Sequence, residues 1–275
     1  MKPLLDAVIH NASESTLVRD GDEIYGHLGK AFGDGFGLRV YGEYEEESKS
    51  FHAEYFFPYV DSDTVSTTVR CTVERHSDKN SYGGMCEEPA IGVSLIFYLS
   101  NGMEYVRRVT GKTESSKISA VYLSGLCLSG KILLPVKKTA KQRANGIAAS
   151  KNRGSLIEAA RNGDEQAMES LAMEDMNLVQ QISSRLPQED IYSIVDTCFM
   201  PYGLECDQYA IIGEILKVES LRNQYSGEEV FRLLIDCNDM KFSVMLNKMD
   251  LLGEPEVGRR FKGDIWLQGR AEFAV

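Results

Sequence analysis

The feature that most constrains the fold is a two-residue alternation of apolar side chains in the first half of the chain. It covers residues 51–59 and 65–73, where nearly every second residue is apolar. Successive side chains of a strand point to opposite faces, so this spacing is typical of strands with one buried face. A polar run at residues 45–49 predicts a hairpin turn before the first of these strands. We therefore expect an antiparallel sheet in residues 1–136.

Further apolar runs extend this prediction. Residues 118–123 and 132–136 indicate two more strands, and residues 38–40 indicate one before the hairpin turn. The run at 91–99 fits either a central strand or the start of a helix, and Gly102 favours a break after it.

The two-residue alternation is lost in residues 155–204, where helical signals replace it. Residues 156–160 indicate a short helix that ends at Asn162-Gly163, and Asp164 is placed as the N-cap of the next helix. A further helix is expected near 175–185, ended by Pro187. We expect a helical hairpin unit that packs on one of its neighbours.

The last part of the chain, residues 205–275, returns to strand patterns. Four strands are expected, at 209–218, 229–236, 241–247 and 261–268. Three meandering strands, a crossing and a fourth strand resemble the order of an OB-type barrel. Such a barrel has five strands, so an open antiparallel sheet is an equal alternative.

A cluster of basic residues separates the first sheet-rich part of the chain from the helical part. Residues 137–154 hold six basic side chains and no acidic one, without apolar periodicity, and we interpret them as an exposed basic linker. The overall composition, 43% apolar and 26% charged, is that of an ordinary globular protein. The predicted class is α+β: an N-terminal antiparallel sheet domain (1–136), the linker, the hairpin unit and a C-terminal OB-like or open antiparallel β-domain.

No complete catalytic motif is present. The segment 125–131 matches the spacing of a phosphate-binding loop, but Ile132 stands where a magnesium-binding Ser or Thr is needed and no helix can follow. Glu74, Arg75 and His76 form the nearest approach to a catalytic cluster, with His76 as general base. An enzyme with a cleft between domains near these three residues is therefore one alternative function.

The metal and redox residues are dispersed. The chain has six cysteines without a CxxC pair and four histidines without ligand spacing, so we expect no metal site and no cofactor. Free, reduced cysteines predict a cytoplasmic protein, and no apolar run is long enough to cross a membrane.

The last strand is the basis of a second alternative. Basic side chains beside an aromatic ring can bind single-stranded nucleic acid. The net charge of −11, from 41 acidic and 30 basic residues, disfavours that function, and we favour a solvated polar face as the explanation of the pattern. Trp266 is also a candidate interface anchor. The candidate binding residues are Arg259, Arg260, Lys262, Trp266 and Arg270.

Several segments together resemble one uncharacterised bacterial protein family of unknown function. The resemblance covers the chain from about residue 38 and implies no activity, so it assigns no catalytic residue. The segments that carry it are Tyr55–Tyr59, Val73–His76, Leu95–Leu99, Ser129–Pro135, Cys206–Tyr209, Asp236–Asp239, Leu251–Gly263 and Trp266–Gly269.

The leading hypothesis is a non-enzymatic binding or scaffold protein. It presents its C-terminal β-domain to an unknown protein or other macromolecular partner. The sequence does not identify that partner or the oligomeric state.

Overall fold

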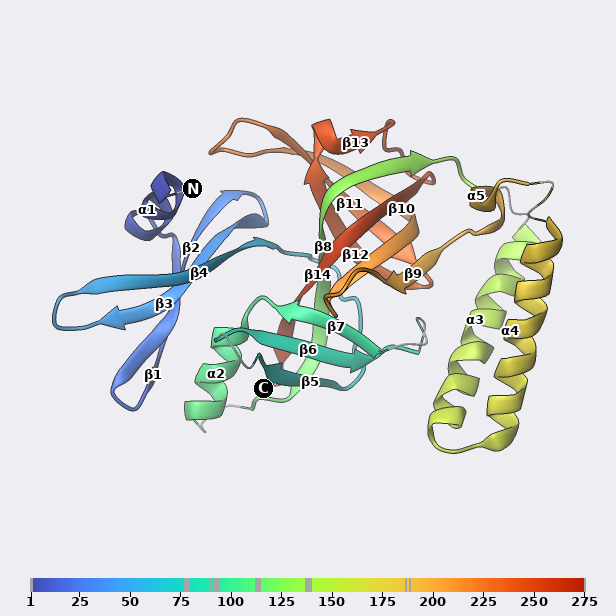
Figure 1. The fold of residues 1–275 in the computed structure, drawn as a ribbon, viewed down its shortest axis with the longest axis horizontal. Coiled ribbons are helices and arrows are strands. Elements are labelled where there is room, and N and C mark those ends of the chain that lie inside the picture. Colours follow the sequence, from blue (N-terminus) through green and yellow to red (C-terminus); the bar gives the residue numbers. More distant parts are fainter. Residues whose placement is uncertain are drawn as a thin grey trace.

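The computed structural model describes residues 2–76, 80–89, 91, 94–111, 115–136, 140–185, 187 and 189–274. It confirms the α+β class, with an antiparallel sheet at the N-terminus, a larger mixed sheet and a pair of long helices (Figure 1).

The N-terminal sheet, sheet A, pairs its strands in the order β1-β2-β3-β4. The predicted turn at 45–49 is confirmed, since β3 and β4 pair as antiparallel neighbours on either side of it and Lys49 adopts a φ of 52°. The first two strands were not predicted, because their apolar alternation is weak. The elements are α1 (Lys2–His10), β1 (Glu14–Asp20), β2 (Glu23–Gly33), β3 (Phe36–Glu45) and β4 (Ser50–Val60).

The second sheet, sheet B, combines strands from both halves of the chain. They are β5 (Cys71–Arg75), β6 (Tyr82–Glu87), β7 (Ser94–Leu99), β8 (Ile118–Leu133), β9 (Cys198–Pro201), β10 (Gln208–Arg222), β11 (Glu229–Cys237), β12 (Met240–Asn247), β13 (Leu251–Leu252) and β14 (Arg260–Phe273). Two of the helical segments between them are α2 (Gly102–Gly111) and the 3-10 turn η1 (Lys248–Asp250).

Among the described residues, five strands of sheet B close into a ring. β10, β11 and β12 form the predicted meander, β8 pairs in parallel with β12 and antiparallel with β14, and β14 pairs with β10. The open-sheet alternative is therefore wrong. The strand that residues 205–275 lack is supplied by β8, which lies within residues 1–136. Strands β7, β6 and β5 continue the sheet from the other end of β14.

The interior of the ring is filled by apolar side chains. Alternate residues of β12, such as Phe242 and Val244, are fully buried there, together with Leu233 and Ile235 of β11. Asn238 and Asp239 join the two strands with positive φ values of 54° and 67°, the conformation that a two-residue hairpin turn needs.

The outward face of β12 is buried as well, because sheet A lies across it. Met245 is 3% exposed and packs with Phe36, Val40 and Val60 of sheet A. Ser243 Oγ lies 3.1 Å from Ser62 Oγ at the same contact. Burial on both faces explains why the sequence of β12 is almost continuously apolar.

The helical part begins earlier than predicted. α3 (Ala140–Arg161) runs through most of the predicted basic linker, and α4 (Glu165–Arg185) follows after a short turn. Residues 137–139 of that linker lie outside the described residues. The linker interpretation was wrong because Ala, Lys, Gln and Arg favour helix even where apolar periodicity is absent. The N-cap prediction is confirmed, since Asp164 Oδ1 accepts a hydrogen bond from Ala167 N at 3.1 Å.

Two strand predictions also need correction. Residues 65–70 cross from sheet A to sheet B, and Thr67 makes only an isolated bridge with Val121 before β5 begins at Cys71. This segment crosses between the two sheets and its backbone meets β8 only at Val121, so its alternation does not produce a continuous strand. The segments 118–123 and 132–136 are not separate strands, because the single strand β8 spans 118–133.

Candidate functional site

The predicted catalytic cluster lies at an exposed hairpin. Glu74, Arg75 and His76 are all exposed at the end of β5, and Arg75 donates a hydrogen bond to Asn80. The pocket beside β5 is lined by residues 70–73 of the same strand and by none of these three. The structure therefore does not place Glu74, Arg75 and His76 in a cleft between domains.

Arg260, one of the predicted binding residues, is buried and holds the two ends of the helical segment. Its guanidinium donates to the carbonyl of Leu134, at 2.7 and 2.9 Å, on the chain leading into α3. It also donates to the carbonyls of Tyr192 and Val195, both at 2.6 Å, on the chain that returns through the short helix α5 (Ile191–Ile194). Arg260 is thus a structural clamp.

The other predicted binding residues also have partners inside the protein. Trp266 Nε1 donates to Asp207 at 2.7 Å, and its ring packs against Phe57 and Tyr98. Three cations complete the set: Arg259 pairs with Glu256 at 2.9 Å, Lys262 lies over the Tyr192 ring and Arg270 lies over the Tyr122 ring. Because these basic residues have partners within the protein, they do not form a free basic strip along the last strand.

The outer face of the β-ring is covered where β11 and β12 meet sheet A. Arg232 on β11 is 8% exposed and donates to Glu219 and Asp34, each at 2.9 Å. Asp34 belongs to the turn between β2 and β3 of sheet A, so the chain itself occupies this face. A partner has no access to β11 and β12 from that side.

An exposed apolar surface lies instead on α4. Met168, Ala172, Met176 and Val179 follow the i, i+4, i+8, i+11 spacing that places side chains on one face of a helix. We call these four residues the α4 stripe. All four are exposed, and Met176 retains 73% of its accessible surface. The helical period could have predicted the stripe, but a period does not distinguish a buried face from an exposed one.

The α4 stripe points away from the contact between the helices. Ala167 is buried, and the Arg153 guanidinium of α3 joins Glu174 and Asp175 of α4, at 3.3 and 2.7 Å. The side chains of the other basic residues predicted in the linker lie outside the described residues. At the far end of α3, Arg161 forms an ion pair with Glu87 of β6 at 2.7 Å. The two helices thus lie beside the β-ring (Figure 1), and the exposed α4 stripe is not part of their mutual contact.

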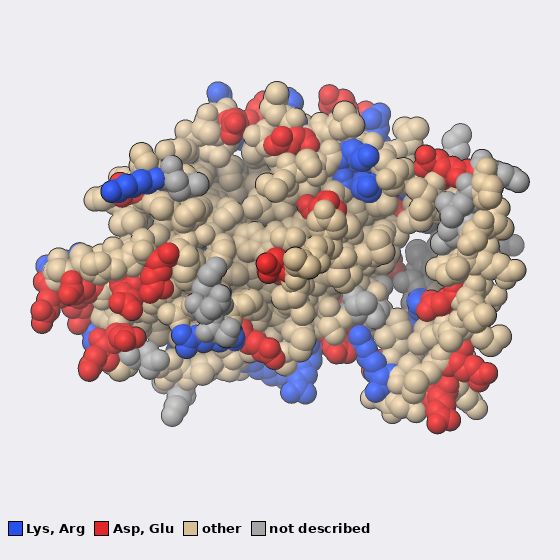
Figure 2. All heavy atoms as spheres, viewed as in Figure 1, with Lys and Arg blue, Asp and Glu red and all other residues tan. Residues whose placement is uncertain are grey.

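Acidic side chains accompany the α4 stripe at its N-terminal end. Glu165 and Glu169 are exposed there, and neither forms an ion pair with a residue that the structure describes. Figure 2 shows this helix at the right edge of the molecule, with little charge along its middle and acidic side chains at its lower end. The surface therefore combines apolar contact area with uncompensated negative charge.

The side chains that could bind a metal are not grouped together in the described part of the chain. No group of three or more His, Cys, Asp or Glu side chains there could hold a metal ion. The six cysteines are free, and burial raises the pKa of the Cys127 thiol to about 11 and that of Cys86 to about 12. These two thiols are neutral near pH 7. Among the described helices, none has the length and apolarity needed to cross a membrane.

Comparison with known proteins gives the family and no activity. A family model described as "Domain of unknown function, E. rectale Gene description (DUF3881)" matches residues 1–269. The chain belongs to this family. The match includes the first 37 residues, which the resemblance noted from the sequence did not cover. Neither a curated protein nor a solved structure matches the chain.

Proposed function

We propose that this DUF3881 protein is a non-enzymatic binding protein that uses the α4 stripe to hold a basic, amphipathic helix of a partner protein. The observation that carries the proposal is the exposure of four apolar side chains in register on a helix attached to the barrel. A monomeric protein rarely exposes a contiguous apolar face unless it binds something.

The composition of the stripe supports a helical partner. An amphipathic helix lays its apolar face into an apolar surface and is recognised through residues at i, i+3, i+4 and i+7. Methionine side chains are flexible and polarisable, and they adapt to different apolar partners. Two Met residues in the stripe, with Met173 exposed beside them, therefore favour contact with a helix.

The acidic residues beside the α4 stripe favour a partner helix that carries basic side chains. Glu165 and Glu169 attract lysine or arginine side chains that flank an apolar face, and complementary charge increases the association rate and the specificity. A second copy that pairs through α4 places no cation directly opposite these two residues. In an antiparallel pair of α4 helices centred between Ala172 and Met176, Glu165 faces Ser183 and Glu169 faces Val179.

The β-ring acts in this proposal as a scaffold. Its five strands support the comparison with an OB-type barrel, whose second and third strands and adjoining loops carry ligands. Here sheet A covers that face of β11 and β12. We therefore propose that the partner contacts the helices and not the C-terminal β-domain. We keep the expectation of a bacterial, cytoplasmic protein with reduced cysteines.

The test uses the full chain and a synthetic helical peptide. The peptide has about 20 residues, with leucine at i, i+3, i+4 and i+7 and lysine at the other positions, and its binding is followed by fluorescence anisotropy. We expect saturable binding that the double substitution Met176→Glu and Val179→Glu weakens at least about tenfold. The matched control, Met249→Glu, changes an exposed apolar residue of η1 and leaves binding unchanged.

A second pair of measurements tests the charge and the choice of partner. Glu165→Gln with Glu169→Gln should weaken binding and flatten its dependence on salt. Sedimentation equilibrium of the free chain should give a monomer. A dimer that the double substitution dissociates, or peptide binding that is indifferent to it, would overturn the proposal.

A further inference from the structure

A pocket of about 810 Å³ lies between β5, α2 and the start of β8, away from the α4 stripe. Its lining includes Arg70, Cys71, Val73, Tyr105, Lys117 and Ile118, with the hydroxyl residues Thr68, Thr72 and Ser116 among them. This volume lies within the usual range of small-ligand sites.

The pocket lining includes two cations, Arg70 and Lys117. Arg70 and Lys117 have exposed side chains, and neither forms an ion pair or side-chain hydrogen bond with the residues that the structure describes. In a chain with a net charge of −11, two such cations at one concave site form a local reversal of charge. The site therefore favours an anion.

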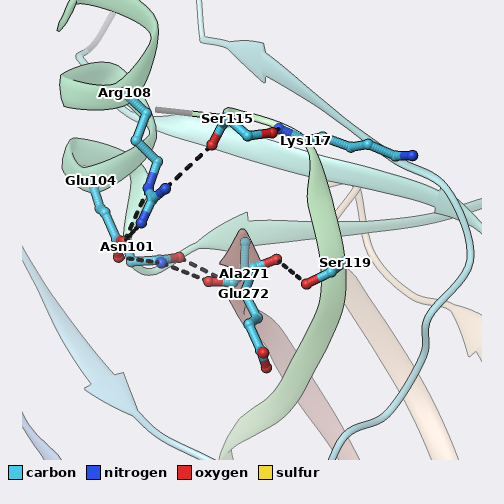
Figure 3. A network of polar contacts seen from close by, with 8 residues as sticks. All are labelled: Asn101, Glu104, Arg108, Ser115, Lys117, Ser119, Ala271 and Glu272. Atoms are coloured by element: carbon cyan, nitrogen blue, oxygen red, sulfur yellow. Dashed lines mark hydrogen bonds and ion pairs between the residues drawn. The ribbon is translucent and has the colours of Figure 1, made fainter. Parts of the chain in front are cut away.

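The neighbouring network fixes the backbone that carries Lys117. Arg108 is held by Glu104 at 3.0 Å and donates to the Ser115 carbonyl at 3.3 Å. Lys117 N donates to Ser115 Oγ at 3.2 Å, and Ala274 N donates to the Lys117 carbonyl at 2.8 Å. Figure 3 shows the Lys117 side chain extending away from this network. The lysine is thus presented on an ordered segment, and Arg108 is not available to the pocket.

The donors fit a phosphate group better than a carboxylate. A phosphate monoester carries a charge between −1.5 and −2 and three acceptor oxygens, which two cations and several hydroxyls can share. Thr68 and Ser116 supply hydroxyls from two separate segments of the lining. A single carboxylate would leave part of this set unused.

The rest of the lining suits the organic part of such an ester. Val73, Tyr105 and Ile118 give it an apolar wall. Burial raises the pKa of the Cys71 thiol to about 11, so this sulfur is neutral near pH 7 and neither repels the anion nor attacks it.

We infer that this pocket binds a soluble organic phosphate monoester, with Arg70 and Lys117 on the phosphate and the Tyr105 side of the lining on the carbon skeleton. The site is independent of the α4 stripe, and either can be correct without the other.

Calorimetric titration of the full chain with phenyl phosphate, at low salt and pH 7.5, tests the inference. We expect measurable binding that is tighter than for inorganic phosphate, because the ring adds contact with the apolar wall. Arg70→Ala and Lys117→Ala should each weaken it about tenfold or more. Both side chains are exposed, so these variants should fold. Arg107→Ala removes an exposed arginine of α2 that does not line the pocket, and it should leave the affinity within twofold.

A parallel arm separates a free ester from a lipid headgroup. Vesicles of phosphatidylcholine with one-fifth phosphatidic acid should not retain the protein, because a concave pocket admits a small ester more readily than a bilayer surface. Vesicle binding without phenyl phosphate binding would overturn the inference. So would binding of phenyl phosphate that survives both Arg70→Ala and Lys117→Ala.

Discussion

Sheet A and the α3–α4 hairpin are both additions to the same β-ring, and they are attached in different ways. Sheet A covers a broad apolar face, where Met245 of the barrel is 3% exposed. The hairpin is attached through its two connecting segments, by the Arg260 clamp and the Arg161–Glu87 ion pair, and its Met176 is 73% exposed. Methionine is thus buried where sheet A packs on the ring and exposed on the hairpin.

One strand, β14, holds both additions through a single buried polar side chain each. Gln268 accepts a hydrogen bond from Val60 N at 3.1 Å and donates to the Pro58 carbonyl at 2.9 Å, which joins the end of β4 to the barrel. Arg260 plays the corresponding part for the hairpin. The two clamps differ in what surrounds them: an apolar interface lies around Gln268, whereas Arg260 binds the two connecting segments of the hairpin. We conclude that sheet A belongs to the folding unit and that the hairpin is an arm.

Deleting each addition should give the largest difference between them. A chain without residues 1–60 should lose cooperative unfolding, because the outward face of β12 becomes exposed and Arg232 loses Asp34. A chain in which four Gly or Ser residues replace residues 137–188 should stay folded, with its melting temperature within about 4 °C of the full chain. Four residues are enough for this replacement because the two chain ends lie close together: the carbonyls of Leu134 and Tyr192 accept hydrogen bonds from the same nitrogen of Arg260.

Circular dichroism melts of the two deletions provide the measurement, with the full chain as reference. Equal loss of structure in both would contradict the distinction between folding unit and arm. So would a folded protein lacking sheet A.

The substitution Gln268→Leu should have the next largest effect. It keeps the side-chain volume near that of Gln but leaves Val60 N and the Pro58 carbonyl buried without partners, at a cost of about 3 kcal/mol in the free energy of unfolding. Urea unfolding measures the cost, and amide exchange should show lost protection in β4 with none lost in α4. A cost below about 1 kcal/mol would mean that the clamp is unimportant.

Much of the fold could be predicted because neighbouring strands are joined by short turns. The turn before β4, the β10–β11–β12 meander and the Asp164 cap depend on residues a few positions apart, and such patterns are visible in one sequence. The fifth strand of the ring was missed because β8 and β12 pair across more than a hundred residues. Nothing in the apolar alternation of β8 identifies its partner.

The candidate sites were predicted less well, for a related reason. Arg260 and Trp266 look like free binding groups in the sequence, and the structure gives each a partner from a distant segment. Met176 has the spacing of a core residue and is exposed. The sequence reports the type and period of a side chain, but its availability depends on what the rest of the chain places against it.

The smallest of the three expected effects is a pH dependence confined to sheet A. Burial and the nearby Arg39 guanidinium lower the pKa of His27 from 6.5 to about 4, while Glu14, whose Oε1 lies 3.8 Å from His27 Nε2, opposes the shift. Because the folded state holds this imidazole neutral, its stabilising contribution is present above pH 6.5 and is lost as the pH falls towards 4. The loss between pH 7 and pH 5 should be about 2 kcal/mol.

Asp61 makes the free energy of unfolding depend less steeply on pH, but His27 remains the main cause of the dependence. Burial raises the pKa of the Asp61 carboxyl, against the effect of Arg39, so its protonation at lower pH favours the folded state and offsets part of the loss. The measurement is urea unfolding at pH 7 and pH 5, with amide exchange to locate the change. His27→Gln should flatten the dependence, and His76→Gln, at an exposed position, should not. Protection lost equally from sheet A and from α4 would mean that the arm shares the stability of the barrel, against the distinction drawn between them.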